Sequence, residues 1–462
     1  MFPWMLALVL SSIAAAQTAP VYVTLWFDTE DYIEPAADDA ALRLALDLDG
    51  LGVRATFKVV GEKARVLEAR GRDDVIRALS RHDIGYHAET HSIPPAPAVY
   101  LRELGFHEGA AEFERREGRG AGDVRRIFGV VPSCYGQPGS SWGPQSNPAL
   151  RRMGIPVYLD EGSQVSLDGQ PFWYGGLLYV FGLKQFVLRA SLDPKVPPEE
   201  ARKSFDRAAA ELRARGGGIV SVYYHPTEFV TTEFWDGVNF RYGANPEKPD
   251  WKRPGRRTAE DSERCYGVLR SFVEYMKAQP GVRFVTAREF PQIYRSPFPP
   301  KAGLQRIREH LAARITFLTV PDGSLSAADM LLALLNVEPQ VVDGPEARKQ
   351  STYTGSSVPR AAFDRARADA AGYVRARKAL PAMVWIGSTY LSLPDFAATL
   401  AGDDGLSAEV QVRRGILEFE RYFATDARRA FNWVIHPEGF DPKELLELAR
   451  LQGWTLKPAV LR

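Results

Sequence analysis

Two short segments of the sequence carry side chains that could bind one metal ion. His87 and His91 lie four residues apart, so a single helical turn would point both imidazoles toward the same ion. A metal site that keeps one position open for water also needs a third ligand, commonly a carboxylate. Asp28, Glu30 and Asp31 are three candidates, and they close an apolar run. The spacing predicts a site with one carboxylate and two histidines.

A third segment ends on a histidine in a similar way. Residues 219–224 form a largely apolar run that stops at His225. If these runs are parallel strands of an α/β barrel, their carboxyl ends share the face where active sites lie. Each segment alone also has a structural explanation, because paired histidines occur by chance and acids after strands form turns or cap helices. The conjunction of the three segments favours a shared metal site.

Residues 20–294 alternate short apolar runs with segments of helical periodicity. The runs predicted as strands are 21–27, 55–60, 83–87, 157–160, 218–225 and 282–285. The segments predicted as helices are 38–49, 73–81, 144–153, 198–215 and 258–279. This alternation favours an α/β fold with a mainly parallel sheet and helices outside it. Periodicity alone does not distinguish a barrel from a doubly wound sheet.

The three chemical segments also have a familiar order. Phe-Asp-x-Glu-Asp-Tyr, then His-x-x-x-His after Ile-Gly-Tyr, then a strand ending in His-Pro-x-Glu-Phe resembles the polysaccharide deacetylase superfamily (NodB homology, carbohydrate esterase family four). The resemblance covers residues 20–295 and is closest to the branch whose first motif is Asp-x-Glu/Asp rather than Asp-Asp. It implies a distorted (β/α) barrel of about seven strands.

The resemblance also implies a role for each motif residue. These are Asp28 as general base, Glu30, His87 and His91 as metal ligands, and His225 as general acid. Asp31 is a competing ligand, although a capping or hydrogen-bonding role suits it better. Zinc is the expected metal, and cobalt or manganese would also fit this donor set.

These roles describe the hydrolysis of an amide. The metal would polarise a water molecule and the acyl carbonyl, and Asp28 would take a proton from the water. His225 would protonate the departing amine, while the backbone amide of Tyr135 is placed to donate to the oxyanion. The expected reaction removes N-acetyl groups from a polysaccharide or cell-wall glycan.

The third and fourth family motifs are altered. Gln137 stands where the family has an arginine that pairs with the base, and a neutral amide cannot lower the pKa of Asp28 as a charge would. The Asp-Trp pair of the fourth motif is not recognisable, although residues 158–161 lie near its place. Two alternatives therefore stay open. One is a weak or inactive glycan-binding protein on a deacetylase scaffold, and the other is a hydrolase of a different non-peptide C–N bond.

Two further segments of this region lack a motif. The long loop 228–257 is rich in aromatic residues, including Trp235, which could stack on sugar rings in a glycan groove or form a small separate core. Residues 98–122 predict a solvated helix followed by a glycine-rich turn.

The chain divides into three predicted parts. Residues 1–16 resemble a signal peptide that is cleaved before Gln17, although they lack Lys or Arg, so we expect an exported protein. Residues 17–297 form the barrel, and a proline-rich linker leads into an α-rich domain at 298–462. In this domain 317–331 parallels 384–397, a weak repeat that resembles pseudomurein-binding-type repeats. It could attach to cell-wall glycan or serve as a packing domain.

Composition limits the choice of partners. A net charge of +1, from 58 Lys+Arg and 57 Asp+Glu, gives no indication of nucleic acid as a partner. The apolar N-terminal run is too short for a comfortable membrane span, so no stable insertion is expected after cleavage. Cys134 and Cys265 could form one disulfide in an exported protein or remain two buried thiols. The oligomeric state is not predicted.

Overall fold

The computed structural model describes residues 19–295, 298 and 300–462. The predicted signal peptide, 1–16, lies outside these residues, as does part of the predicted linker. No helix among the described residues is both long and apolar enough to span a membrane.

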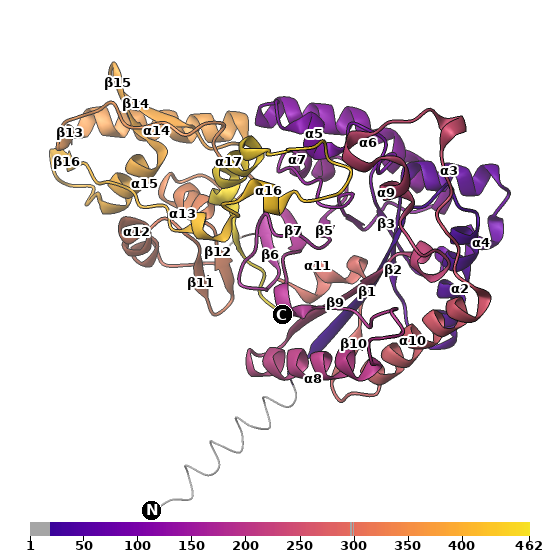
Figure 1. Cartoon of the computed structure of the whole chain (residues 1–462). Helices are drawn as coiled ribbons and strands as arrows, with labels where there is room; N and C mark the ends of the chain where they lie inside the picture. The colour runs from indigo at the N-terminus through magenta and orange to yellow at the C-terminus, as the bar shows by residue number, and fades with distance from the viewer. Residues whose placement is uncertain (1–18, 296–297, 299) are drawn as a thin grey trace, which may run out of the picture.

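The centre of the structure is a curled sheet organised around β1 (Val21–Thr29) (Figure 1). β1 pairs in parallel with β2 (Thr56–Val59) and β9 (Gly218–Tyr224), and its first residues also pair with β10 (Val282–Phe284). All residues of β1 except Tyr22 are buried, as expected for a parallel strand covered on both faces.

The other strands extend the sheet on both sides of β1. Beyond β2 the parallel order is β3 (Asp83–Tyr86), β4 (Cys134–Tyr135), β5 (Val157–Leu159) and β7 (Leu177–Val180), and beyond β9 lies β8 (Val187–Leu188). β6 (Phe172–Tyr174) and then β17 (Lys457–Pro458) are antiparallel edge strands. Among the described residues the outer edges of β8 and β17 are unpaired, so the barrel is open. The predicted distorted (β/α) barrel is confirmed.

Helices surround this sheet (Figure 1). They are α2 (Ala36–Gly50), α3 (Gly61–Ala69), α4 (Asp73–Leu79), α5 (Pro97–Leu101), α6 (Phe106–Phe128), α7 (Ser146–Arg152), α8 (Pro198–Ala214), α9 (Trp235–Asn239), α10 (Ala259–Lys277) and α11 (Phe290–Ile293). All five predicted helices are present with small shifts at their ends. The strands β4, β6, β7, β8 and β17 were not predicted, because runs of two to four residues are too short to show a periodicity.

The glycine-rich turn predicted at the end of segment 98–122 is wrong. Those glycines lie inside α6, which continues to Phe128 and ends at Gly129 with a φ of 71°, a left-handed helix end. A Cβ on Gly61 of α3 would come within 2.5 Å of the Gly120 Cα. The glycines therefore allow α3 and α6 to pack backbone against backbone.

The chain after residue 300 forms a second group of elements, here called the C-terminal lobe (residues 300–456). It contains α12 (Leu304–Ala313), β11 (Leu318–Val320), β12 (Gly323–Leu325), α13 (Ala327–Leu334), β13 (Ser357–Pro359), α14 (Arg360–Arg377), β14 (Met383–Ile386), β15 (Thr389–Ser392), α15 (Leu393–Gly402), β16 (Glu409–Gln411), α16 (Ala427–Ala430) and α17 (Lys443–Gln452). After the lobe, the chain returns to the sheet as β17, and the Arg295 N–H donates to the Val460 carbonyl at 2.8 Å.

The weak repeat of the lobe has a structural counterpart. Each copy is a helix, a β-hairpin and a second helix: α12, β11, β12, α13 and then α14, β14, β15, α15. Ser326 and Ser392 cap the second helices, accepting from the backbone N–H groups of Asp329 and Asp395. These predicted N-caps are confirmed.

The two cysteines remain apart. Cys134 and Cys265 are free, buried thiols. Of the two alternatives in the sequence, the structure shows the pair of thiols.

Candidate metal centre

The chemical side chains gather at the carboxyl end of the central strands. Asp28 lies near the end of β1, and Glu30 is the first residue after that strand. His87 comes immediately after β3, and His225 immediately after β9. Because β9, β1, β2 and β3 are parallel neighbours, their ends meet at one edge of the sheet. The segments that the sequence predicted to meet are therefore adjacent.

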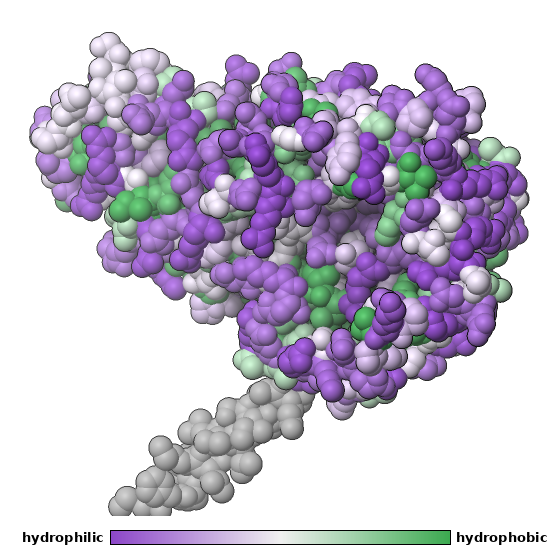
Figure 2. Space-filling view, in the orientation of Figure 1, coloured by the Kyte–Doolittle hydropathy of each residue, from purple (hydrophilic) through white to green (hydrophobic). Residues whose placement is uncertain are grey.

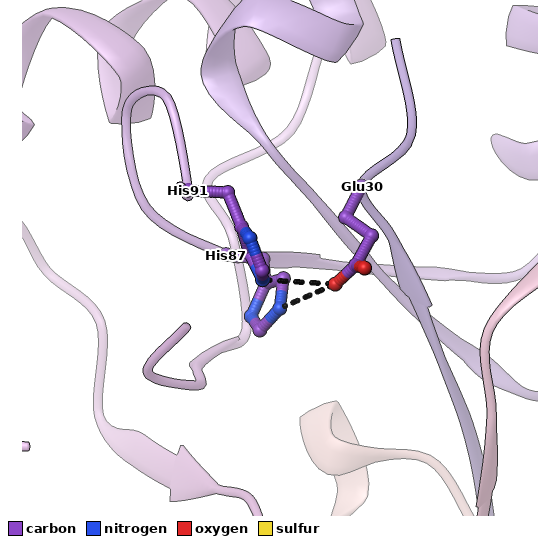
Figure 3. A group of neighbouring side chains, drawn as sticks. All are labelled: Glu30, His87 and His91. Carbon is purple, nitrogen blue, oxygen red and sulfur yellow. Dashed lines mark ion pairs between the residues drawn. The ribbon is translucent and has the colours of Figure 1, made fainter. Parts of the chain in front are cut away.

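Glu30 and the two histidines converge on one point (Figure 3). Glu30 Oε2 lies 2.9 Å from His91 Nε2 and 3.4 Å from His87 Nε2, and all three side chains are buried. The opposite ring nitrogens are held in place, since His87 Nδ1 donates to the Gly136 carbonyl at 3.0 Å and His91 Nδ1 contacts Ser92 Oγ at 2.5 Å.

This donor set fits a divalent metal. His91 Nε2 is buried and has no hydrogen-bond partner among the described residues, although it faces Glu30. A fixed Nδ1 leaves Nε2 to present its lone pair, which is the usual arrangement around histidine ligands. One carboxylate and two imidazoles leave further coordination positions open for water and substrate.

The two histidines do not reach this point through a helical turn, so that expectation is wrong. Residues 87–92 form a bent loop in which Ala88 and His91 have φ values of 68° and 60°. These left-handed conformations are uncommon for residues other than glycine and are found at functional sites. They turn the chain so that both rings face Glu30.

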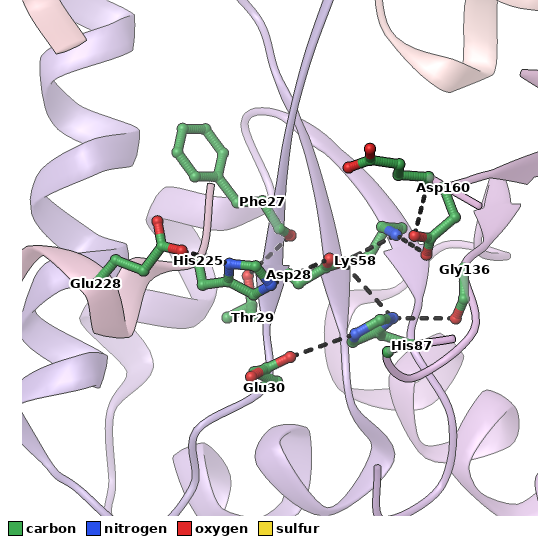
Figure 4. A network of polar contacts seen from close by, with 12 residues as sticks. Phe27, Asp28, Thr29, Glu30, Lys58, His87, Gly136, Asp160, His225 and Glu228 are labelled. Atoms are coloured by element: carbon green, nitrogen blue, oxygen red, sulfur yellow. Dashed lines mark hydrogen bonds and ion pairs between the residues drawn. The ribbon is translucent and has the colours of Figure 1, made fainter. Parts of the chain in front are cut away.

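Asp28 and His225 lie beside the candidate metal ligands (Figure 4). His225 Nε2 is 3.6 Å from Asp28 Oδ2, and His225 Nδ1 is 3.0 Å from Glu228 Oε1. Burial lowers the pKa of His225, but the charges of Glu30 and Glu228 outweigh it and raise the pKa to about 9. His225 is therefore protonated at neutral pH.

We expect replacement of Glu228 by Gln to lower the pKa of His225 in the metal-free protein. The substitution removes one negative charge in contact with the ring, which is worth about one pKa unit. Titration of the His225 ring protons by NMR measures both values. An unchanged pKa near 9 in Glu228→Gln would assign the shift to the other carboxylates.

A buried lysine that sequence reasoning missed completes the site. Lys58, on β2, is fully buried and its Nζ lies 2.9 Å from Asp28 Oδ1 and 2.6 Å from Asp160 Oδ2. Burial raises the pKa of Asp28, but His87 and Lys58 more than offset this, and the pKa falls below its usual value. Lys58 thus supplies the positive charge that Gln137 cannot. Its sequence signal is a lysine inside an apolar strand.

A second group of possible ligands includes this lysine's partners. Atoms of Asp28, His87 and Asp160 also lie within 4.8 Å of one another. Since the Lys58 ammonium already bridges the two carboxylates, this group holds a cation of its own. Glu30, His87 and His91 remain the better metal site.

The remaining predicted site residues have other contacts. Gln137 lines the cavity, and its Nε2 donates to the carbonyls of Gly139 and Glu161 at 3.2 and 2.9 Å. The Asp31 carboxylate accepts from the backbone N–H groups of Ile33 and Glu34, both at 3.0 Å, so it has a hydrogen-bonding role in the turn before α2.

Two predicted substrate contacts lie behind the cavity. Tyr135 is buried on β4 and does not line the cavity. Trp235 is also fully buried, and its Nε1 donates to Glu30 Oε1 at 3.1 Å. The structure therefore places Trp235 as support for the carboxylate ligand rather than as a platform for sugar.

Three of the six aromatic residues of the long loop belong to a small separate core, and Phe229 lies in the main core. Trp235 and Phe240 pack with Tyr32, and Trp251 lies against them. Phe234 differs because it is 38% exposed and lines the cavity beside His225. The packing alternative holds for most of this loop.

The site opens into a large cavity. Its volume is about 1040 Å³, and Asp28, Glu30, His87, His91 and His225 line it. Figure 2 shows a hollow in this face of the molecule, bordered by both polar and apolar side chains. The cavity has room for several sugar units.

Comparisons with known proteins find similarity only among solved structures. No family model and no curated protein matches the chain. A family 4 carbohydrate esterase from Streptomyces lividans, in complex with acetate, is 14% identical with a TM-score of 0.30, covering 56% of this chain and 90% of its own. A family 4 acetyl xylan esterase from Clostridium thermocellum, in complex with a cobalt ion, is 18% identical with a TM-score of 0.29, covering 58% and 89%. Puue allantoinase is 13% identical with a TM-score of 0.38, covering 59% and 91%.

Proposed function

We propose that this protein is a metal-dependent hydrolase that removes N-acetyl groups from a polysaccharide or cell-wall glycan. The observation that carries the proposal is the convergence of Glu30, His87 and His91, with the Asp28 carboxylate and the His225 imidazole beside them, 3.6 Å apart. Zinc is the metal that this set of ligands suits best.

The side chains divide the proton transfers between them. A bound divalent metal would polarise the acyl carbonyl and lower the pKa of water. Asp28, ionised because its pKa is low, accepts a proton from the attacking water. His225 donates a proton to the amide nitrogen as the C–N bond breaks. The products are acetate and an amine on the sugar. Of the two protons released by the acetic acid and by Asp28, one restores the protonated His225 and the other leaves the amine as an ammonium group.

The cation at Lys58 supports an enzyme over an inactive scaffold. The alternative of a glycan-binding protein arose from Gln137, which leaves the base without a charged partner in the third motif. Lys58 fills that need from β2, at 2.9 Å from the base. The acids and imidazoles of the family pattern are also all present in one site.

Metal removal and restoration test the proposal. We expect purified protein to hold about one divalent metal per chain and to release acetate from acetylated glucosamine oligomers, with both lost on chelation and restored by zinc. Elemental analysis and an acetate assay measure the two properties. Metal without acetate release would indicate another C–N substrate. A chain that binds no stoichiometric zinc would overturn the enzyme proposal in favour of a glycan-binding scaffold.

A further inference from the structure

A segment of the C-terminal lobe lies over the metal centre. Residues 426–436, here called the strap, include five cavity-lining residues: Arg429, Ala430, Asn432, Trp433 and Val434. The Trp433 and His91 rings meet at 5.2 Å between centroids, nearly perpendicular. A segment far from the barrel motifs in sequence thus touches a predicted metal ligand.

The strap is fastened to barrel loops on both sides of the cavity. The Trp433 N–H donates to Ser140 Oγ at 2.9 Å, and its Nε1 donates to Asp236 Oδ2 at 3.1 Å. The Ala430 carbonyl accepts from Gln164 Nε2 at 2.8 Å. These bonds fix the strap in one position, so it forms a wall of the cavity.

The altered third motif is shaped to receive the indole. Gly139 has a φ of 50°, and a Cβ there would come within 2.2 Å of the Trp433 ring. Any larger residue would displace the indole. Gln137 donates to the Gly139 carbonyl, which holds this loop beneath the ring. The departure from the family pattern at residue 137 therefore coincides with a contact to the strap.

A second aromatic residue lies on the other side of the site. The exposed ring of Phe234 contacts His225 edge to face, with centroids 4.9 Å apart. Trp433 and Phe234 thus line the same cavity, beside a metal ligand and the proposed acid respectively. Apolar faces of this kind pack against the C–H faces of pyranose rings, as aromatic side chains do with other apolar surfaces.

We infer that the strap is part of the substrate site and that Trp433 binds a sugar ring of an extended glycan at the metal centre. The inference rests on the proposed function and names what the C-terminal lobe contributes to it. The lobe is then needed for glycan affinity at this site. Its role differs from that of a separate wall-binding module.

Replacing Trp433 with Ala in the full zinc-loaded chain tests this inference. With the tetramer of N-acetylglucosamine as probe, we expect KM to rise about tenfold and kcat to change less than about threefold, because one stacking contact is lost. Metal content stays the same, and Trp433→Phe keeps most of the affinity. Trp385→Ala is the matched control, since Trp385 is an exposed tryptophan of the same lobe that does not line the cavity.

Two further controls are needed. The variant Gly139→Ala tests the position of the indole while Trp433 is retained, and an equilibrium binding measurement tests the inference without relying on acetate release. Gly139→Ala pushes the indole away without altering it and is expected to weaken binding in the same way. If the wild type releases no acetate, the proposed function fails, but isothermal titration calorimetry with the tetramer still measures binding in both proteins. Equal affinity in wild type and Trp433→Ala, or no binding by the wild type, overturns the inference.

Discussion

Replacing Lys58 with Met is expected to lower kcat at neutral pH by about 10-fold, the loss expected when the pKa of a general base rises about one unit above the working pH. The substitution leaves Asp28 and Asp160 facing each other in a buried site without their shared cation. Two such carboxylates cannot both be ionised readily, so they share a proton. Asp160, whose pKa burial raises to about 7, holds that proton part of the time, so Asp28 is partly protonated at pH 7 and is a poorer proton acceptor.

The pH dependence distinguishes this cause from a general loss of structure. Losing Lys58 raises the pKa of Asp28, so the acidic limb of the kcat profile moves to higher pH and activity recovers as the pH rises. The fold also loses about 3–5 kcal/mol, the usual cost of breaking a buried ion pair. Urea unfolding measures that loss, and kcat is then compared per folded molecule.

Lys63→Met is the matched control. Lys63 is equally buried and pairs with the buried carboxylate of Asp38, and it forms no ion pair with Asp28. We expect a comparable loss of stability with nearly normal kcat in the folded fraction. Wild-type kcat and an unmoved acidic limb in Lys58→Met would show that Asp28 needs no cation.

The sequence was sufficient to predict the parts of the site that follow strands. Asp28, Glu30, His87 and His225 each lie at the end of a run that forms a parallel strand, so strand adjacency brings them together. The spacing of His87 and His91 does not distinguish a helical turn from the bent loop that the structure has. The left-handed φ of Ala88 depends on the packing around it, and an alanine in the sequence does not indicate such a conformation.

The missed residues act through contacts distant in sequence. Lys58 meets Asp160 across 102 positions, and Trp433 meets Ser140 across 293. A lysine in an apolar strand and a tryptophan in a loop near the C-terminus are each compatible with several roles. Only the folded structure shows which residues they contact. The role of Gln137 could not be predicted for the same reason. A glutamine in place of the expected arginine is explained only by the positions of Lys58 and the strap.

Replacing Asp28 with Asn is expected to lower kcat by about 1000-fold while leaving the metal bound. The amide keeps the size of the carboxylate but cannot accept a proton from water. Glu30, His87 and His91 are unchanged, so the metal content measured by elemental analysis stays near that of the wild type. Retention of metal with loss of acetate release separates the base from the ligands.

Asp31→Asn is the control that assigns the neighbouring acid. An asparagine Oδ1 can still accept from the Ile33 and Glu34 N–H groups, so this turn is retained. We expect nearly normal kcat and normal metal content. Loss of metal in Asp31→Asn would instead make Asp31 a ligand, and acetate release by Asp28→Asn at the wild-type rate would remove Asp28 from the reaction. The two substitutions therefore distinguish three roles for these neighbouring acids: general base, metal ligand and hydrogen-bonding residue of a turn.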